Sequence, residues 1–90
     1  MECVHLIISG KVQGVFFRHN TMKKADELGL KGYVRNLQDG SVEVVAEGIK
    51  ENLEELVEFC KNNPGFSKVD DVKVHFEESK SQFNNFEIKK

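Results

Sequence analysis

The dipeptide Asp39-Gly40 constrains the fold of this sequence most, because it lies between two runs that are each interpreted as a strand. The run 32–38 precedes it and the run 41–48 follows it. An Asp-Gly pair between two such runs is a strong signal for a tight β-hairpin. The remaining segments of the chain therefore have to be arranged around an antiparallel pair of strands.

One strand and one helix are expected before this hairpin. Residues 3–9, CVHLIIS, form a short, nearly continuous apolar run, which predicts a central strand buried on both faces. After a loop at 10–17, a helix is expected over 18–28, with Gly29 as its stop. The apolar residues expected on one face of this helix are Met22, Ala25 and Leu28.

A second helix and two strands are expected after the hairpin. The helix, over 49–63, is amphipathic and ends before Pro64-Gly65. Its apolar face consists of Leu53, Leu56, Val57 and Cys60. The pattern at 69–78 alternates apolar and polar residues and predicts a half-solvated strand, and a short last strand is expected at 83–89.

This order of elements predicts the fold class. A β-α-β-β-α-β chain usually forms a ferredoxin-like sandwich. We expect an α+β fold of this kind with an additional short C-terminal strand, whose mixed, mainly antiparallel sheet is covered on one face by two helices. Right-handed crossovers make the first two strands parallel, with the third strand antiparallel between them. Residues 10–18 and 35–37 then lie at the same edge of the sheet and can face one site.

The segment 10–20, GKVQGVFFRHN, has features of an anion site. Gly10 and Gly14 allow sharp turns and close approach to a ligand, and successive N–H groups of such a loop can bind an anion. A cation is unfavourable at the start of a helix, yet Arg18 stands there, and its planar fork matches two phosphate oxygens. The alternative is a solvated arginine beside an ordinary glycine loop. The residues alone leave both interpretations open, since no P-loop or GxGxxG pattern is present.

Asn36 is the second candidate site residue, because asparagine is unusual inside a strand. Either it begins the turn to Asp39-Gly40, or its amide holds a water against an anion beside Arg18. His19 is a possible base, although a solvated helix residue is the simpler interpretation.

Two segments of the sequence resemble the signatures of the acylphosphatase family. Residues 8–18, ISGKVQGVFFR, resemble the first signature, Gly-x-Val-Gln-Gly-Val-x-Phe-Arg. Residues 32–48 resemble the second, Gly-aromatic-Val-basic-Asn followed by Gly-x-Val and a further Gly, with Tyr33 where many members carry Trp. The resemblance implies a single domain over residues 1–90. It also implies hydrolysis of the carboxyl-phosphate bond of acyl phosphates without a metal or cofactor.

The resemblance also implies roles for individual residues. The main-chain N–H groups of the loop would wrap the phosphate, Arg18 would bind phosphate oxygens, and Asn36 would position the attacking water. The loop residues concerned are Lys11, Val12, Gln13, Gly14, Val15, Phe16 and Phe17. These implied roles agree with those suggested by the chemistry of the loop and of Asn36.

Composition and charge limit the partners. The chain has 90 residues and a net charge of −2, without the basic stripe that nucleic-acid binding usually needs. An RNA-recognition module of this fold would need exposed aromatics in an RNP pattern, which is missing. A regulatory domain that binds phosphate without chemistry is the other rival. We expect a small acyl phosphate as the partner.

Targeting and cysteine signals give the remaining expectations. The sequence has no apolar run of membrane-spanning length and no signal peptide, so we expect a cytoplasmic protein that does not bind membranes. We also expect the protein to be a monomer. Cys3 and Cys60 lack metal-ligand spacing and are interpreted as small buried hydrophobes. A disulfide between them is the alternative, although a reducing cytosol disfavours it.

Overall fold

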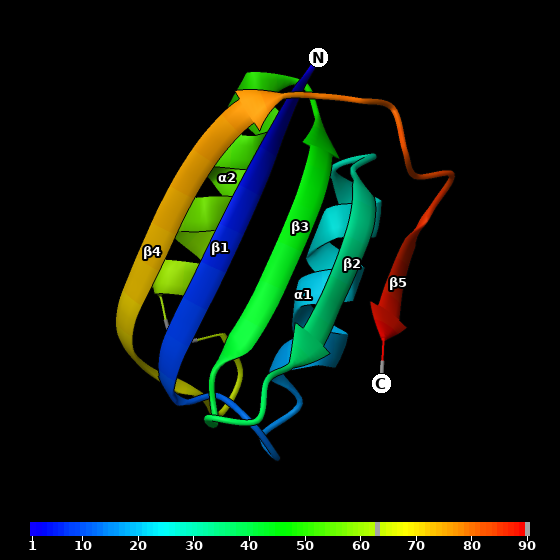
Figure 1. Ribbon diagram of the computed structural model, residues 1–90. Coiled ribbons are helices and arrows are strands. Elements are labelled where there is room, and N and C mark those ends of the chain that lie inside the picture. The colour runs from blue at the N-terminus through cyan, green and yellow to red at the C-terminus, as the bar shows by residue number, and fades with distance from the viewer. Residues whose placement is uncertain (63, 90) are drawn as a thin grey trace.

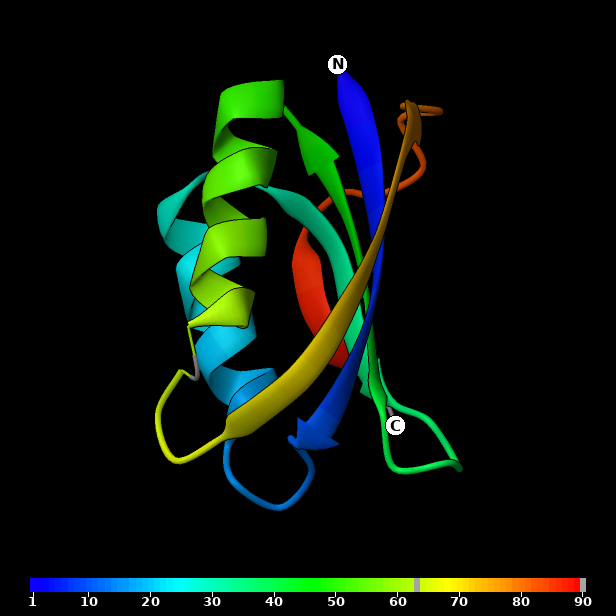
Figure 2. The same cartoon turned by 90° about the vertical axis from the view of Figure 1, so that its left-hand side faces the viewer.

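The computed structural model describes residues 1–62 and 64–89. Its elements are β1 (Glu2–Lys11), α1 (Phe17–Glu27), β2 (Lys31–Asn36), β3 (Val42–Gly48), α2 (Lys50–Lys61), β4 (Lys68–Glu78) and β5 (Phe86–Lys89). The strands of the described residues form one sheet in the order β4-β1-β3-β2-β5 (Figure 1). Both helices cover the same face of this sheet (Figure 2). The predicted ferredoxin-like α+β fold with an added C-terminal strand is confirmed.

The strand register brings the end of β2 beside the end of β1. β3 is antiparallel to both strands, and its first residue, Val42, pairs with Ile8 of β1 on one side and with Asn36 of β2 on the other. The loop that follows β1 and the loop that follows β2 therefore leave the sheet at the same edge, at the bottom of Figure 1. This juxtaposition is the one expected from the order of elements.

The core lies between the sheet and the helices. Val4, Leu6 and Ile8 of β1 are fully buried on the helix-covered face, whereas His5 and Ile7 on the other face are only half-buried. The prediction that this strand is buried on both faces is therefore wrong. The physical reason is that both helices pack on one side, which leaves the other face of even the central strands partly in contact with water (Figure 2).

The predicted buried face is correct for α2 and partly wrong for α1. In α2 the four predicted apolar residues are all buried, and the expected last residue, Asn63, lies outside the described residues. In α1 the predicted stripe is partly wrong, since Met22 and Leu28 are only partly buried while Phe17, Thr21 and Ala25 are fully buried. The helix begins one residue early, at Phe17. The anchoring of this ring in the core turns the stripe at 17, 21 and 25 toward the sheet.

The hairpin has a longer loop than predicted. β2 ends at Asn36 and β3 begins at Val42, so residues 37–41 form the hairpin loop. The Leu37 N–H donates to the Ser41 carbonyl at 2.8 Å, and the Asp39 carboxylate accepts from the Ser41 N–H at 3.0 Å. This side-chain-to-backbone turn takes Leu37 and its neighbour out of the predicted strand. The two-residue connection expected from Asp39-Gly40 is therefore wrong.

The C-terminal strand and the cysteines complete the fold. β5 runs parallel to β2, with Ile88 beside Val34, and is shorter than the predicted segment 83–89. Cys3 and Cys60 are both free and buried, so the disulfide alternative is wrong. Burial raises the pKa of the Cys60 thiol to about 12. No helix among the described residues has the length and apolar character required to span a membrane.

Candidate active site

The β1–α1 loop, residues 12–16, is built with unusual backbone angles. Gly14 has a φ of +74°, and Phe16, the residue that precedes the first turn of α1, has a φ of +64°. Positive φ is costly for a residue with a large side chain, and such strain tends to occur at functional sites. The ring of Phe16 is also 72% exposed. Folding alone does not account for this conformation, because an exposed aromatic ring contributes little to the core.

The loop presents a run of unpartnered main-chain N–H groups. The Val12 N–H donates to the Gly10 carbonyl at 3.1 Å, and the Asn20 N–H donates to the Phe16 carbonyl at 3.0 Å. Between these two, the N–H groups of residues 13–19 make no hydrogen bond with the described part of the chain. No side chain of the described residues caps the start of this helix either. Successive free N–H groups at a helix N-terminus attract anions, because they carry the positive end of the helix dipole.

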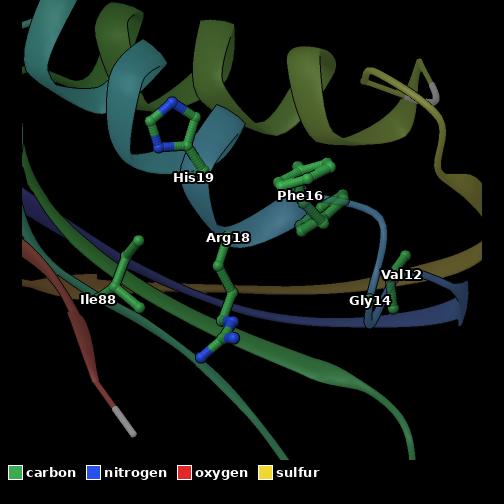
Figure 3. Close-up of a pocket in the computed structure, with 7 residues that line it drawn as sticks. Val12, Gly14, Phe16, Arg18, His19 and Ile88 are labelled. Carbon is green, nitrogen blue, oxygen red and sulfur yellow. The ribbon is translucent and has the colours of Figure 1, made fainter.

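Arg18 stands beside these N–H groups, and none of the described residues pairs with it. Within residues 1–62 and 64–89 its half-buried side chain makes no hydrogen bond or ion pair. It extends from the start of α1 toward the sheet (Figure 3). It lines a cavity of about 260 Å³, whose other lining residues are Val12, Gly14, Phe16, Phe17, His19 and Ile88. A permanent cation, free N–H groups and an open cavity are thus combined at one place.

Asn36 lies at the same edge of the sheet as this loop but does not line the cavity. Strand alternation puts it on the helix-covered face, as it does Val34. Its side-chain Oδ1 is buried and has no hydrogen-bond donor among the described residues. A buried acceptor without a donor costs about 1–3 kcal/mol, so it calls for an explanation beyond the fold.

The side chain of Gln13 has a contact that the sequence reasoning missed. Its Nε2 donates to the carbonyl oxygens of Leu37 and Ser41, at 2.8 Å each. The sequence suggested a role for Gln13 only through its main chain. A long side-chain amide in a glycine loop is the only sequence signal for this contact, and it does not identify the acceptors.

Of the remaining candidate residues, Lys11, Val15 and His19, only His19 lines the cavity. Lys11 is exposed at the end of β1, opposite Lys68, and Val15 is partly buried against the core. His19 is exposed and lines the cavity. Among residues 1–62 and 64–89, no group of three or more His, Cys, Asp or Glu is arranged to hold a metal ion.

The fold and the loop together define a class of protein: a ferredoxin-like sandwich with an anion-attracting turn between its first strand and first helix. Comparison with known proteins identifies the family. The acylphosphatase family model matches residues 4–88. The chain belongs to the acylphosphatase family, whose members are hydrolases that act on acyl phosphates.

Individual relatives resemble the chain over nearly its full length. The acylphosphatase of Caldanaerobacter subterraneus subsp. tengcongensis is 48% identical to this chain, and the match covers 97% of this chain and 97% of the relative's length. The crystal structure of acylphosphatase from Bacillus subtilis superposes with a TM-score of 0.95 at 40% identity, covering 100% of both chains. An acylphosphatase from Coxiella burnetii gives a TM-score of 0.90 at 39% identity, over 98% of this chain and 93% of that one.

Proposed function

We propose that the loop Lys11–Phe17 and Arg18 hold the phosphoryl group of an acyl phosphate, and that Asn36 positions the water that attacks it. The observation that supports this most is the unpartnered Arg18 beside the free N–H groups of residues 13–19. The Val12 N–H is already used by Gly10, so the donors to phosphate begin at Gln13. Lys11 and Val12 then act by shaping the start of the loop.

The chemistry is a displacement at phosphorus. The water oxygen forms a bond to phosphorus as the bond between phosphorus and the carboxyl oxygen breaks. The carboxylate leaves with the electron pair, and it needs no acid because it is a weak base. Charge on the equatorial phosphoryl oxygens is stabilised by Arg18 and the loop N–H groups. The main work of the site is therefore positioning and charge stabilisation.

The proton of the water goes to the substrate in this proposal. The amide of Asn36 cannot accept a proton at neutral pH, but its unpartnered Oδ1 can accept a hydrogen bond from the water. A phosphate oxygen of the substrate then takes the proton, giving carboxylate and dihydrogen or hydrogen phosphate. Loss of turnover in His19→Ala, with phosphate affinity unchanged, would instead assign the base to His19.

Titration calorimetry with inorganic phosphate tests the binding part of the proposal. We expect phosphate to bind the wild-type protein and to bind the Arg18→Ala variant at least about tenfold more weakly, since a charge-assisted bidentate contact is lost. Arg35→Ala is the matched control, because Arg35 lies on the opposite face of the sheet and pairs with Glu43. Equal phosphate affinity in Arg18→Ala and the wild type would contradict the assignment of the cavity.

A further inference from the structure

We propose that Gln13 is a positioning residue for the reaction: its side chain holds the hairpin loop, and through it Asn36, in place relative to the loop that binds phosphate. This inference rests on the function proposed above. It adds a role for a side chain that touches neither phosphate nor water. The observation that carries it is the pair of hydrogen bonds from Gln13 to the hairpin loop.

The contact is made where the two ends of the hairpin loop lie side by side. A primary amide has two N–H donors, and Gln13 uses both, one on Leu37 and one on Ser41, at 2.8 Å each. The same two residues close the loop through the hydrogen bond from the Leu37 N–H to the Ser41 carbonyl. The Ser41 carbonyl oxygen thus accepts one hydrogen bond from the Gln13 side chain and one from the Leu37 N–H. One side chain therefore ties together the first and last residues of the hairpin loop.

This tie reaches Asn36 directly. Asn36 precedes Leu37 in the chain, and the tip of the hairpin loop, residues 38–40, is exposed. Exposed loop tips are the mobile parts of most folds, and a displacement of about 1 Å at a reacting group can reduce the rate by about 100-fold. The β1–α1 loop and the hairpin loop come from different strands. Apart from the two hydrogen bonds of Gln13, no hydrogen bond among the described residues joins these two loops.

The chemistry of a glutamine side chain suits the proposed role of position 13. Leu37 and Ser41 present carbonyl oxygens, which accept but cannot donate. Glutamate at position 13 would have the same length and shape but would set a carboxylate against these two acceptors. Methionine would keep the length and the packing but would lose both donors. These two substitutions therefore remove the tie with little change of volume.

A double-mutant cycle tests the inference, with kcat and KM measured on benzoyl phosphate and Kd measured for inorganic phosphate. We expect Gln13→Met to lower kcat about tenfold while the phosphate Kd stays within about twofold, because the loop N–H groups and Arg18 remain. In the Asn36→Ala background we expect Gln13→Met to lower kcat by less than about twofold, since a residue that acts through Asn36 has nothing left to position. Gln13→Glu should lower kcat at least as much as Gln13→Met.

Controls separate this inference from a general loss of structure and from the proposed function. Gln38→Ala, on the exposed tip of the same loop, should keep wild-type kinetics, and urea unfolding of each variant checks the fold. If Gln13→Met lowers kcat by the same factor in the wild type and in the Asn36→Ala background, the positioning role is overturned. It is also overturned if Gln13→Met weakens phosphate binding by the same factor as it lowers kcat. If Asn36→Ala alone keeps wild-type kcat, the water-positioning role fails instead. Should Gln13→Met not fold, Gln13→Glu in the same cycle decides.

Discussion

The two arginines of the chain stand on opposite sides of one sheet and have opposite surroundings. Arg35, on the uncovered face, donates from Nε to Glu43 Oε1 at 2.5 Å. Arg18, at the start of α1 on the covered side, has no protein partner within the described residues. A paired cation is already neutralised, whereas an unpaired one beside free N–H groups favours an anionic ligand. One arginine is thus paired within the fold, and the other is left without a partner among the described residues, as the proposed phosphate site requires.

The carboxylate that pairs with Arg35 is the centre of a small network. Glu43 lies directly across the hairpin from Arg35, and its side chain is only 11% exposed. It also accepts from His5 Nε2 at 2.7 Å and from the Tyr33 hydroxyl at 3.3 Å. Burial by itself would raise the pKa of Glu43, but the hydrogen bonds from His5 and Arg35 outweigh burial, so this pKa lies below its usual value.

Neighbouring residues of β2 repeat the same contrast. Arg35 faces the uncovered side and is paired, while Asn36, one residue later, faces the covered side with a buried Oδ1 that no described residue satisfies. The fold therefore completes the contacts of one side chain and leaves the next one incomplete. Incomplete buried contacts are expected where a ligand supplies the missing partner.

The largest effect is expected for Arg18→Ala. The kcat/KM for benzoyl phosphate should fall about 1000-fold, because the proposed charge-assisted contact to the transferring phosphoryl group is lost. The free energy of unfolding should stay the same or rise by about 0.3–1 kcal/mol, since a cation leaves the positive end of a helix. Steady-state kinetics and urea unfolding check both parts. A large loss of stability in Arg18→Ala would show that this arginine also serves the fold.

The next effect is expected for Asn36→Ala. We expect kcat to fall at least about 100-fold with little change in phosphate affinity, because in the proposed mechanism this residue positions water and does not bind the anion. Stability should fall little, since Oδ1 makes no hydrogen bond within residues 1–62 and 64–89 that could be lost. Single-turnover kinetics together with phosphate titration measure this split. Activity equal to the wild type would remove the water-positioning role.

A smaller effect, on stability alone, is expected for Glu43→Gln. The free energy of unfolding should fall by about 1 kcal/mol, because charge-assisted hydrogen bonds from His5 and Arg35 become weaker neutral ones. Since the network lies on the uncovered face, kcat/KM should stay within about twofold of the wild type. Urea unfolding at pH 7 and the benzoyl phosphate assay measure the two quantities. A loss of activity larger than the loss of stability would link the two faces of the sheet.

The smallest effect is a pH dependence of stability. The pKa of Glu43 is lower in the folded than in the unfolded protein, so its contribution to stability is present above the unfolded pKa, near 4.3–4.5. This contribution is lost as the pH falls through the folded pKa. We expect the wild type to lose more stability than Glu43→Gln between pH 6 and pH 3.5, as measured by urea midpoints. Parallel pH profiles for the two proteins would exclude this assignment.

The hairpin register shows where the sequence stops being sufficient. A two-residue turn at Asp39-Gly40 would pair Arg35 with Val44. The observed five-residue loop pairs Arg35 with Glu43 and Asn36 with Val42. A shift of one residue in register reverses the faces of a strand, so the length of this loop decides whether Arg35 lies opposite Glu43. The sequence contains the Asp39 side chain that lengthens the loop, but its hydrogen bond to Ser41 forms only in the turn.

The sequence by itself determined the order of elements, the ferredoxin-like fold, the apolar face of α2 and the edge of the sheet where the β1–α1 loop and Asn36 meet. Hydrophobic periodicity and turn residues are local signals, and chain connectivity restricts the topology that joins them. Only the tertiary structure decided which face of α1 is buried and that Arg35 pairs with Glu43. It also decided that Arg18 has no partner among the described residues and that Gln13 hydrogen-bonds to the hairpin loop. These depend on contacts between residues far apart in the chain, and such contacts leave no periodic trace in the sequence.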